Sequence, residues 1–248
     1  MSMQPQVTIA VPSFNQGRFL DKALASIFEQ DLPVEVFVLD GGSSDNSVEV
    51  IKKWEHKLAG WRSQRDNGQS AAINEGIAKG SAPYVCWINS DDWLLPGGLS
   101  SLINTLNQHP KAPAAYGKAW NFIEKNQSMR PVWVEPFNVR RLALRCIIAQ
   151  PATLMRRSAW EAIGGLDESL HMTMDYDLWW RLFKTFGPLI HVDNFVAVNR
   201  EHELTKTKTN RRLHYQEAIK TIRKHHSHVP LKWWLAQPYK VWLKSITG

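Results

Sequence analysis

The side chains best suited to chemistry form the group NSDD at residues 89–92, at the end of an apolar run. The run YVCWIN at residues 84–89 is typical of a buried strand, so these polar groups stand where that strand ends. Asp91 and Asp92 could hold a hard divalent ion through oxygen and leave coordination positions for phosphate oxygens and water. They could equally start a turn or cap a helix, as aspartate often does. Taken alone, the group leaves both interpretations open.

Two further polar groups follow apolar runs earlier in the chain. Residues 13–15 come after QVTIAVP (6–12), and residues 40–44 come at the end of VEVFVLD (34–40). Helical spacing of apolar residues follows these runs, and the alternation of strands and helices predicts a parallel sheet. Ligands bind at the carboxyl ends of such strands, so we expect the polar groups to converge on one site.

The elements predicted in this first half are strands at 6–12, 34–40, 61–64 and 84–89 and helices at 19–28, 45–56 and 69–79. Beyond residue 112 the pattern weakens and predicts strands at 114–123, 130–137 and 195–200 and helices at 156–163 and 175–186. From about residue 206 the chain is helical, basic and aromatic. We therefore divide it into an α/β domain at 1–205, with a mostly parallel central sheet flanked by helices, and a basic, Trp-rich helical extension at 206–248.

Composition limits the classes of protein that the chain can be. Its 248 residues, of which 44% are hydrophobic, can bury a core without disulfides. Its two cysteines, Cys86 and Cys146, lie far apart and outside any metal-binding spacing. So few cysteines suit a protein of the reducing cytosol. The net charge of +7 favours anionic partners, but no nucleic-acid reader motif is present, so we expect no nucleic-acid partner. The start MSMQPQ lacks signal-peptide features and no 18-residue apolar run occurs, which favours a cytoplasmic protein.

Three common motifs are absent: G-x-G-x-x-G after the first strand, G-x-x-x-x-G-K-[ST], and G-x-S-x-G. Instead, the chain resembles the family 2 glycosyltransferases with the GT-A fold in five ordered segments: IAVPSFNQGRFL, VLDGGSSDNS, RDNGQSAAINEGIAKGSAPYVCWINSDD, QPATLMRRSAWEAIGGLDESL and MDYDLWWRL. The resemblance covers roughly residues 6–205. It implies a Rossmann-like sheet and an inverting transfer of a sugar from a nucleoside-diphosphate donor to a hydroxyl of a glycan or lipid-linked acceptor. It also implies Mn²⁺ or Mg²⁺ as cofactor and a setting in bacterial surface-polysaccharide or lipopolysaccharide synthesis.

The resemblance gives roles to the residues that match the family's motifs. Asp91 takes the place of the usual metal-binding acid, and His202 in VNREHELTKT would contact the metal or the diphosphate. The residues that would bind the donor are Pro12, Phe14, Asn15, Asp40, Asp66, Gln69, Asn89, Ser90 and Arg200. Two positions depart from the family pattern: Asn89 replaces the first acid of the DxDD motif, and Gly41 replaces a frequent second aspartate. The first departure weakens the case for a second metal carboxylate.

The segment MDYDLW resembles the family's catalytic-base motif, usually written EDYDLW, and it matches the base to Asp175. Residues two apart on a helix point about 200° apart, so Asp175 and Asp177 cannot both face one sugar. Asp175 lies at the expected start of a helix, where it could also serve only as a cap.

Two other classes of function remain open. A nucleotidyltransferase has a similar α/β layout and needs metal-binding acids, but it would carry a Gly-rich basic loop after the first strand, of which PSFNQGR is a poor version. A catalytically silent nucleotide-sugar-binding module would have lost its acids, whereas Asp40, Asp91 and Asp175 are present.

The end of the chain, LKWWLAQPYKVWLKSI at residues 231–246, projects as a basic amphipathic helix. Such a helix could lie in a membrane interface, which would suit a lipid-linked acceptor at the inner face of the membrane. It could instead pack on its own domain or on a second subunit, and Pro238 would kink it either way.

Overall fold

The computed structural model describes residues 4–237, and the side chains of residues 4–235. Its strands are β1 (Val7–Ser13), β2 (Val34–Asp40), β3 (Gly60–Ser63), β4 (Tyr84–Trp87), β5 (Trp93–Leu94), β6 (Ala114–Ile123), β7 (Ser128–Pro131), β8 (Thr153–Arg156) and β9 (Ile190–Glu201). Its α-helices are α1 (Gly17–Phe28), α2 (Ser47–Trp54), α3 (Gln69–Lys79), α4 (Gly98–Gln108), α5 (Val139–Leu144), α6 (Arg157–Ala162), α7 (Met174–Phe186), α8 (Lys206–Thr209), α9 (Arg211–His226) and α10 (Leu231–Gln237). The 3-10 helices are η1 (Glu55–Lys57), η2 (Glu124–Asn126) and η3 (Gln150–Ala152).

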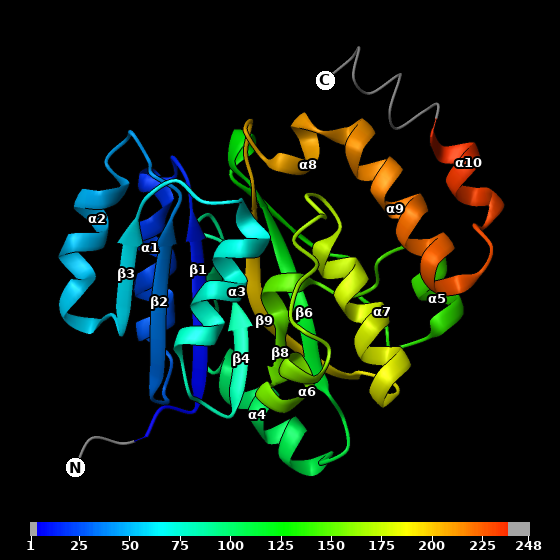
Figure 1. Ribbon diagram of the computed structural model, residues 1–248, viewed down its shortest axis with the longest axis horizontal. Coiled ribbons are helices and arrows are strands. Elements are labelled where there is room, and N and C mark those ends of the chain that lie inside the picture. Colours follow the sequence, from blue (N-terminus) through cyan, green and yellow to red (C-terminus); the bar gives the residue numbers. More distant parts are fainter. Residues whose placement is uncertain (1–3, 238–248) are drawn as a thin grey trace.

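One mixed β-sheet runs through the described part of the chain in the order β3-β2-β1-β4-β8-β6-β9-β5, with β7 paired to β6 (Figure 1). The strands β3, β2, β1 and β4 are parallel, and Ser13 at the end of β1 pairs with Asp40 at the end of β2. β1 and β4 are buried along their whole length, as parallel strands covered by helices on both faces must be. β8 then joins antiparallel between β4 and β6, and β9 lies parallel to β6. The predicted α/β fold is confirmed.

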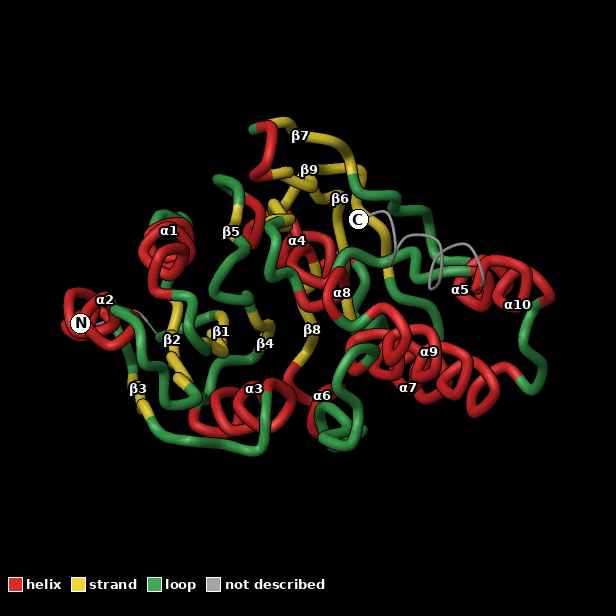
Figure 2. The backbone as a smooth tube through the Cα atoms, turned by 90° about the horizontal axis from the view of Figure 1, so that it is seen from above, coloured by secondary structure: helices red, strands yellow, loops and turns green. Residues whose placement is uncertain are grey.

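Helices cover both faces of this sheet (Figure 2). Helices α1, α2 and α4 lie on one face, and α3, α6 and α7 lie on the other, where α9 packs against α7. The apolar positions of α1 recur at helical spacing, and Phe19, Leu20, Leu24 and Ile27 are all at most 5% exposed. Burying each such side chain contributes about 1.5–3 kcal/mol, so this stripe fixes α1 on the sheet.

The largest departure from the predicted elements is α4, where the sequence LLPGG (94–98) predicts only a turn. Gly97 has φ +69° and precedes the first residue of the helix. A Cβ atom on Gly98 would lie 2.7 Å from the carbonyl oxygen of Val196, so only glycine lets the helix start against β9. The glycine pair therefore marks the start of helix α4, whereas the sequence predicts only a turn there.

Two strand boundaries also differ from the prediction. The strand predicted at 130–137 ends at Pro131, and residues 132–137 are outside the sheet. β9 begins at Ile190, before the predicted 195, because it continues beside β6 past a register shift.

The chain after β9 forms a helical segment that packs on the rest of the molecule. The boundary predicted at 205/206 falls between β9 and α8, and Ile222 of α9 belongs to the same apolar cluster as Leu178 of α7. Helix α10 is the described part of the helix predicted at 231–246, whose residues 238–246 lie outside the described residues. Among the helices that the structure describes, none has the length and hydropathy needed to span a bilayer.

Candidate active site

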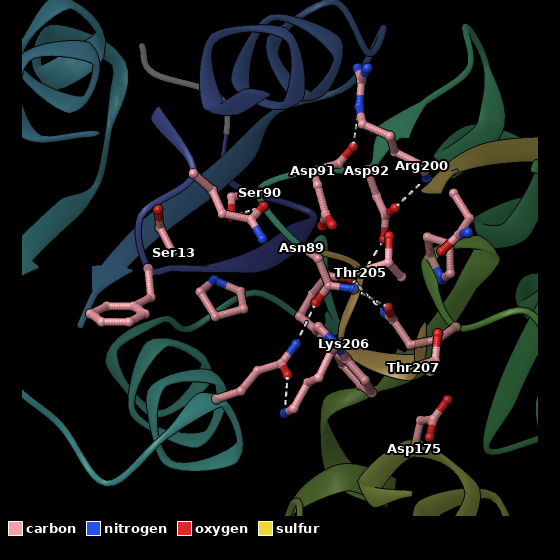
Figure 3. Close-up of a pocket in the computed structure, with 18 of the residues that line it drawn as sticks. Ser13, Asn89, Ser90, Asp91, Asp92, Asp175, Arg200, Thr205, Lys206 and Thr207 are labelled. Atoms are coloured by element: carbon pink, nitrogen blue, oxygen red, sulfur yellow. Dashed lines mark hydrogen bonds between the residues drawn. The ribbon is translucent and has the colours of Figure 1, made fainter. Parts of the chain in front are cut away.

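A cavity of about 1040 Å³ opens where the parallel strands end, and polar residues from distant parts of the chain line it (Figure 3). Of the predicted site residues, those that line it are Pro12, Phe14, Asp66, Gln69, Asn89, Ser90, Asp91, Asp175 and Arg200. Asn15, Asp40 and His202 are not part of the lining. The polar groups after β1 and β4 thus converge, as expected for the ends of neighbouring parallel strands.

Asn89 is the centre of a hydrogen-bond network on the floor of the cavity. Its Oδ1 accepts a hydrogen bond from Gln69 Nε2 (2.8 Å), and its Nδ2 donates to Asp92 Oδ2 (3.0 Å) and Gln150 Oε1 (3.2 Å). Gln150 Nε2 in turn donates to the carbonyl oxygen of Trp87 at the end of β4 (2.8 Å). An amide can donate and accept at once, whereas an ionised acid at position 89 could only accept. The asparagine therefore bonds to Gln69, Asp92 and Gln150 through one side chain.

Asp91 and Asp92 point to different partners. Asp91 Oδ2 lies 3.1 Å from Nε2 of His202, a side chain that is buried beside the ring of Phe19. Asp92 Oδ1 accepts a hydrogen bond from the backbone N–H of Arg200 (2.9 Å), and the guanidinium Nε of Arg200 donates to the carbonyl oxygen of Asp91 (3.1 Å). These contacts bring the end of β9 against the turn after β4.

The two acids also differ in their electrostatic surroundings. Asp92 is 2% exposed, and burial together with the neighbouring charge of Asp91 raises its pKa well above the usual range. Both acids belong to the cavity lining, but the Asp91 side chain is 16% exposed and is thus the one that can present a carboxylate to a ligand. Asp92 instead ties the turn to β9.

Asp91 and His202 are the residues that could hold a metal ion. Within the described residues, no group of three or more His, Cys, Asp or Glu side chains could form a metal site by itself. Mn²⁺ and Mg²⁺ can complete their coordination with phosphate oxygens and water. One carboxylate oxygen and one imidazole nitrogen therefore fit an ion that is bound together with a diphosphate.

Asp175 stands at the start of α7 and faces the cavity. Burial raises the pKa of its carboxyl group, although the backbone N–H of Tyr176, which donates to Oδ1 (2.8 Å), and the charge of Lys206 lower it in part. A carboxylate whose pKa is raised binds a proton more strongly than an exposed carboxylate does. Asp175 is therefore suited to accept a proton.

Asp177 points away from the cavity, toward α9. Its carboxylate is fully buried and accepts hydrogen bonds from Arg181 Nε (2.6 Å), Lys224 Nζ (3.1 Å) and His225 Nε2 (2.7 Å). Burial alone would raise its pKa, but the hydrogen bonds from His225 and Arg181 hold it well below the usual range. Asp177 is thus a structural anion that joins α7 to α9.

Asp40 and Asn15 shape the turn beside the cavity rather than line it. Asp40 is fully buried and accepts from Gly42 N (3.1 Å), Ser43 N (2.9 Å) and Ser63 Oγ (2.6 Å), while its Oδ1 accepts from Ser43 Oγ (2.5 Å). Asn15 adopts φ +52° and its Oδ1 accepts from the N–H of Ser44 (2.9 Å). Both residues hold the 41–44 turn in place.

The lack of a side chain at Gly41 leaves a slot between an aromatic ring and a carboxylate. A Cβ atom there would lie 3.3 Å from the ring of Phe14 and 3.7 Å from the carboxylate of Asp66. The Phe14 side chain is 62% exposed, whereas Asp66 is held by Arg62 Nη2 (3.2 Å) and Gly68 N (2.9 Å). A flat heterocycle could stack on the ring and meet the carboxylate at its edge.

Three residues at or near the site were missed from the sequence. Lys206 lines the cavity, and its Nζ donates to Gln69 Oε1 (3.0 Å); it stands four residues after His202 in the segment already singled out, which is a usable signal. Gln150 lies in the motif QPAT, which also carries a signal. Glu217, described below, follows no motif and could be found only from the structure.

The fold and the cavity define an α/β protein with acids, amides and cations gathered at the ends of parallel strands. Residues 8–164 match the model of Glycosyl transferase family 2, so the chain belongs to that family. It is 27% identical over 243 residues to an uncharacterized glycosyltransferase of Rickettsia felis, covering 92% of this chain and 38% of the relative. It is 23% identical over 199 residues to the chondroitin synthase of Escherichia coli, covering 79% of this chain and 29% of that enzyme. The chain thus spans well under half the length of these two relatives.

Solved structures share the fold across almost the whole chain. S. aureus TarS 1–349 in complex with UDP superposes with a TM-score of 0.70 at 16% identity, over 96% of this chain and 72% of TarS 1–349. The mannosyltransferase PcManGT of Pyrobaculum calidifontis, in complex with GDP-Man and Mn²⁺, gives 0.70 at 18% identity, over 98% of this chain and 72% of that one. These similarities confirm the predicted GT-A architecture.

Proposed function

We propose that the chain is an inverting, metal-dependent glycosyltransferase that moves a sugar from a nucleoside-diphosphate donor to a hydroxyl group of a glycan or lipid-linked acceptor. The observation that carries the proposal is that one cavity is lined both by Asp175, whose pKa is raised, and by Asp91, which is paired with His202. The first group suits proton abstraction from a hydroxyl, and the second suits a metal-bound diphosphate.

The donor would lie across the ends of the parallel strands. The base would occupy the slot formed by Phe14, Gly41 and Asp66, while Gln69, Asn89 and Ser90 would contact the ribose and the sugar. Arg200 and Lys206 bring positive charge to the same cavity, where they would offset the charge of the diphosphate. The UDP, UDP-GlcNAc and GDP-Man named in the complexes of TarS and PcManGT support a nucleotide-sugar donor.

In the proposed reaction, Asp175 takes the proton of the acceptor hydroxyl. The hydroxyl oxygen attacks the anomeric carbon from the face opposite the diphosphate, which leaves. A single displacement of this kind inverts the anomeric centre. A Mn²⁺ or Mg²⁺ ion held by Asp91 and His202 would offset the charge that grows on the leaving diphosphate. The Asn89 network would hold Asp91 and Gln69 at fixed positions while that charge develops.

The decisive experiment compares wild-type protein with Asp175→Asn. We expect the variant to bind the donor as before and to lose transfer by about 10²–10⁴-fold, the usual contribution of a general base. A thermal-shift screen with UDP-GlcNAc, GDP-mannose and other nucleotide sugars, each with and without Mn²⁺, identifies the donor for this assay. Unchanged turnover in Asp175→Asn would refute the assignment of the base.

The metal site has a separate test. Asp91→Ala should weaken the Mn²⁺-dependent part of donor binding in calorimetry and leave the metal-independent part unchanged, because Asp91 supplies the carboxylate of the proposed site. Equal affinities with and without Mn²⁺ in the wild-type protein would contradict metal dependence.

The relatives support a proposal for the acceptor and the setting. Similarity to the chondroitin synthase of Escherichia coli favours a growing polysaccharide as acceptor, in surface-polysaccharide or lipopolysaccharide synthesis. We propose that residues 1–205 form the catalytic domain, with Lys206 added from the extension at 206–248. The protein would lie in the cytoplasm and contact the inner face of the membrane through that extension.

Helix α10 is the described part of that extension that would touch the membrane. Leu231, Trp234 and Leu235 lie on one side of the helix and are 69%, 44% and 71% exposed. Trp233 anchors the helix through its Nε1, which donates to the carbonyl oxygen of Ala143 (2.9 Å). In flotation with anionic liposomes, Leu231→Ser/Leu235→Ser should reduce binding of the full chain, whereas Leu213→Ser on α9 serves as the matched control. Equal flotation of all three proteins would remove membrane contact from the proposal.

A further inference from the structure

Glu217 is the one carboxylate in α9, a helix that is otherwise basic, and it is buried with 8% exposure. It points at the segment that leads into α7. Its Oε1 accepts a hydrogen bond from the N–H of His171 (3.1 Å), and its Oε2 accepts from Met172 N (2.8 Å) and Thr173 N (3.1 Å). Three consecutive backbone N–H groups thus converge on one carboxylate from a distant part of the sequence. The helix that carries it, α9, lies beside α7 (Figure 1).

This contact fixes the backbone immediately before Asp175. Thr173 stands at the N-terminal boundary of α7 and makes no side-chain cap of its own, so Glu217 takes over the ordering of this end. Consecutive N–H groups form an anion-binding concavity, and three charge-assisted hydrogen bonds leave little freedom to residues 171–173. The position of Asp175, two residues further on, is therefore set by residues 171–173.

The charge of Glu217 also acts on the electrostatics of this helix end. The positive end of the dipole of α7 would stabilise an ionised carboxylate in its first turn and thereby weaken Asp175 as a base. The negative charge of Glu217 offsets that end. The other titratable groups that face Asp175 are the thiol of Cys146, the hydroxyl of Tyr176 and the ammonium of Lys206, which is attracted to both Asp175 and Glu217.

We infer that Glu217 is a positioning residue for the base: it holds the start of α7 in place and keeps Asp175 basic by offsetting the helix end. The inference rests on the proposed role of Asp175. It assigns part of the catalytic arrangement to α9, which lies within the extension and beyond the segment that the family model matches.

The first test measures the ionisation of Asp175 without any substrate. Carboxyl-carbon NMR of aspartate-labelled protein, assigned with Asp175→Asn, gives the titration midpoint in wild type and in Glu217→Gln. We expect the midpoint to fall by about one pH unit in Glu217→Gln, the size expected for a partly buried helix-end charge. Lys224→Met is the matched control, because it cuts another contact between α9 and α7 at Asp177 and should leave the midpoint unchanged.

The second test measures turnover with the donor found by the thermal-shift screen. Glu217→Gln should lower kcat about tenfold and leave the KM for the donor unchanged. The acid limb of its pH–rate profile should move to lower pH by as much as the titration midpoint of Asp175 does. Glu217→Asp keeps the charge but is shorter, so its midpoint should stay near that of wild type while kcat falls less than in Glu217→Gln. This second variant keeps the test usable if Glu217→Gln does not fold.

Two results would overturn the inference: an unchanged Asp175 midpoint in Glu217→Gln, or loss of thermal stability in both Glu217 variants with kcat and the acid limb unaltered. Such a result leaves the proposed function intact, provided that Asp175→Asn is inactive and the wild type transfers sugar. Activity in Asp175→Asn would instead refute the proposed function itself, so the two failures are distinguishable.

Discussion

The proposed donor side of the cavity (residues 12–92) is built on the ends of parallel strands and the turns that follow them, whereas the proposed base side (residues 171–226) is built on α7 and held by α9. Asp40 receives its hydrogen bonds from Gly42 and Ser43, in the turn after β2, and from Ser63 at the end of β3. The start of α7 is instead held by Glu217 from α9. The donor side is therefore a property of the strand ends, and the base side exists only when the later helices have packed.

The same contrast separates the acids by function. Asp40 and Asp177 are fully buried, and each accepts hydrogen bonds from at least three donors. Asp91 and Asp175 line the cavity with fewer partners. Fully bonded carboxylates stabilise the structure, and those with free lone pairs remain available for a ligand or a proton.

The sharpest way to break this comparison is to substitute the two acids of α7 in the same manner. Asp177→Asn should cost about 3–5 kcal/mol, because it leaves Arg181, Lys224 and His225 without their buried anion. For a chain of this length, that corresponds to a loss of roughly 10 °C in Tm. Asp175→Asn should keep or raise the Tm, since the folded protein already disfavours its charge. Thermal denaturation of both variants measures this difference. Equal losses of Tm in the two variants would contradict the division into structural and available carboxylates.

On the donor side, Asp40→Asn should cost about 2 kcal/mol, because the amide cannot accept all the hydrogen bonds that the carboxylate accepts. At temperatures where the variant is folded, its affinity for the nucleotide should stay within a few-fold of wild type. Calorimetry with the nucleotide, alongside denaturation, measures both quantities. A large loss of affinity with unchanged stability would show that Asp40 contacts the donor directly.

Lys206 joins the two sides, because it hydrogen-bonds Gln69 and attracts Asp175. Lys206→Met should lower kcat about tenfold, which corresponds to roughly 1.4 kcal/mol of lost transition-state stabilisation. Lys208→Met is the matched control, since Lys208 pairs with Glu201 (2.7 Å) and does not itself line this cavity. Equal effects of the two variants would mean that only the net charge of the segment matters.

The smallest effect is a separation of two pH windows. The pKa of Asp175 is raised, so transfer should fall as the pH drops through that raised value and the base becomes protonated. The pKa of Asp177 is depressed, so its contribution to stability is present above the unfolded pKa and is lost only as the pH falls through its lower folded value. Activity should therefore disappear at a higher pH than the fold does. A pH–rate profile compared with circular dichroism tests this order.

Much of the donor side could be predicted from the sequence, because its strands, turns and motifs follow one another along the chain. The strands β1 to β4 and the convergence of polar groups at their ends follow from apolar periodicity and from the geometry of parallel sheets. Helix geometry predicted that Asp175 and Asp177 would not share a face, while the choice of Asp175 as the base rested on the family resemblance.

Other features had no such basis. Helix α4 was missed because Gly97 and Gly98 have the composition of a turn. In the structure Gly97 adopts φ +69°, and Val196 leaves no room for a Cβ atom at Gly98. The number of hydrogen bonds that Asp40 accepts depends on which serine hydroxyls and backbone N–H groups surround it in space. The contact of Glu217 with residues 171–173 joins segments separated by more than a helix, and no local pattern encodes it.

The placement of Glu217 has a consequence for the order in which the two sides of the cavity form as the chain leaves the ribosome. The parallel strands that form the donor side are complete by Trp87, so this part of the sheet can assemble while the remainder of the chain is still being made. The start of α7 receives its carboxylate only when residue 217 has emerged. Under the proposed function, a nascent chain could form the slot for the nucleotide base before Asp175 is in place, and sugar transfer would begin only after synthesis has passed α9.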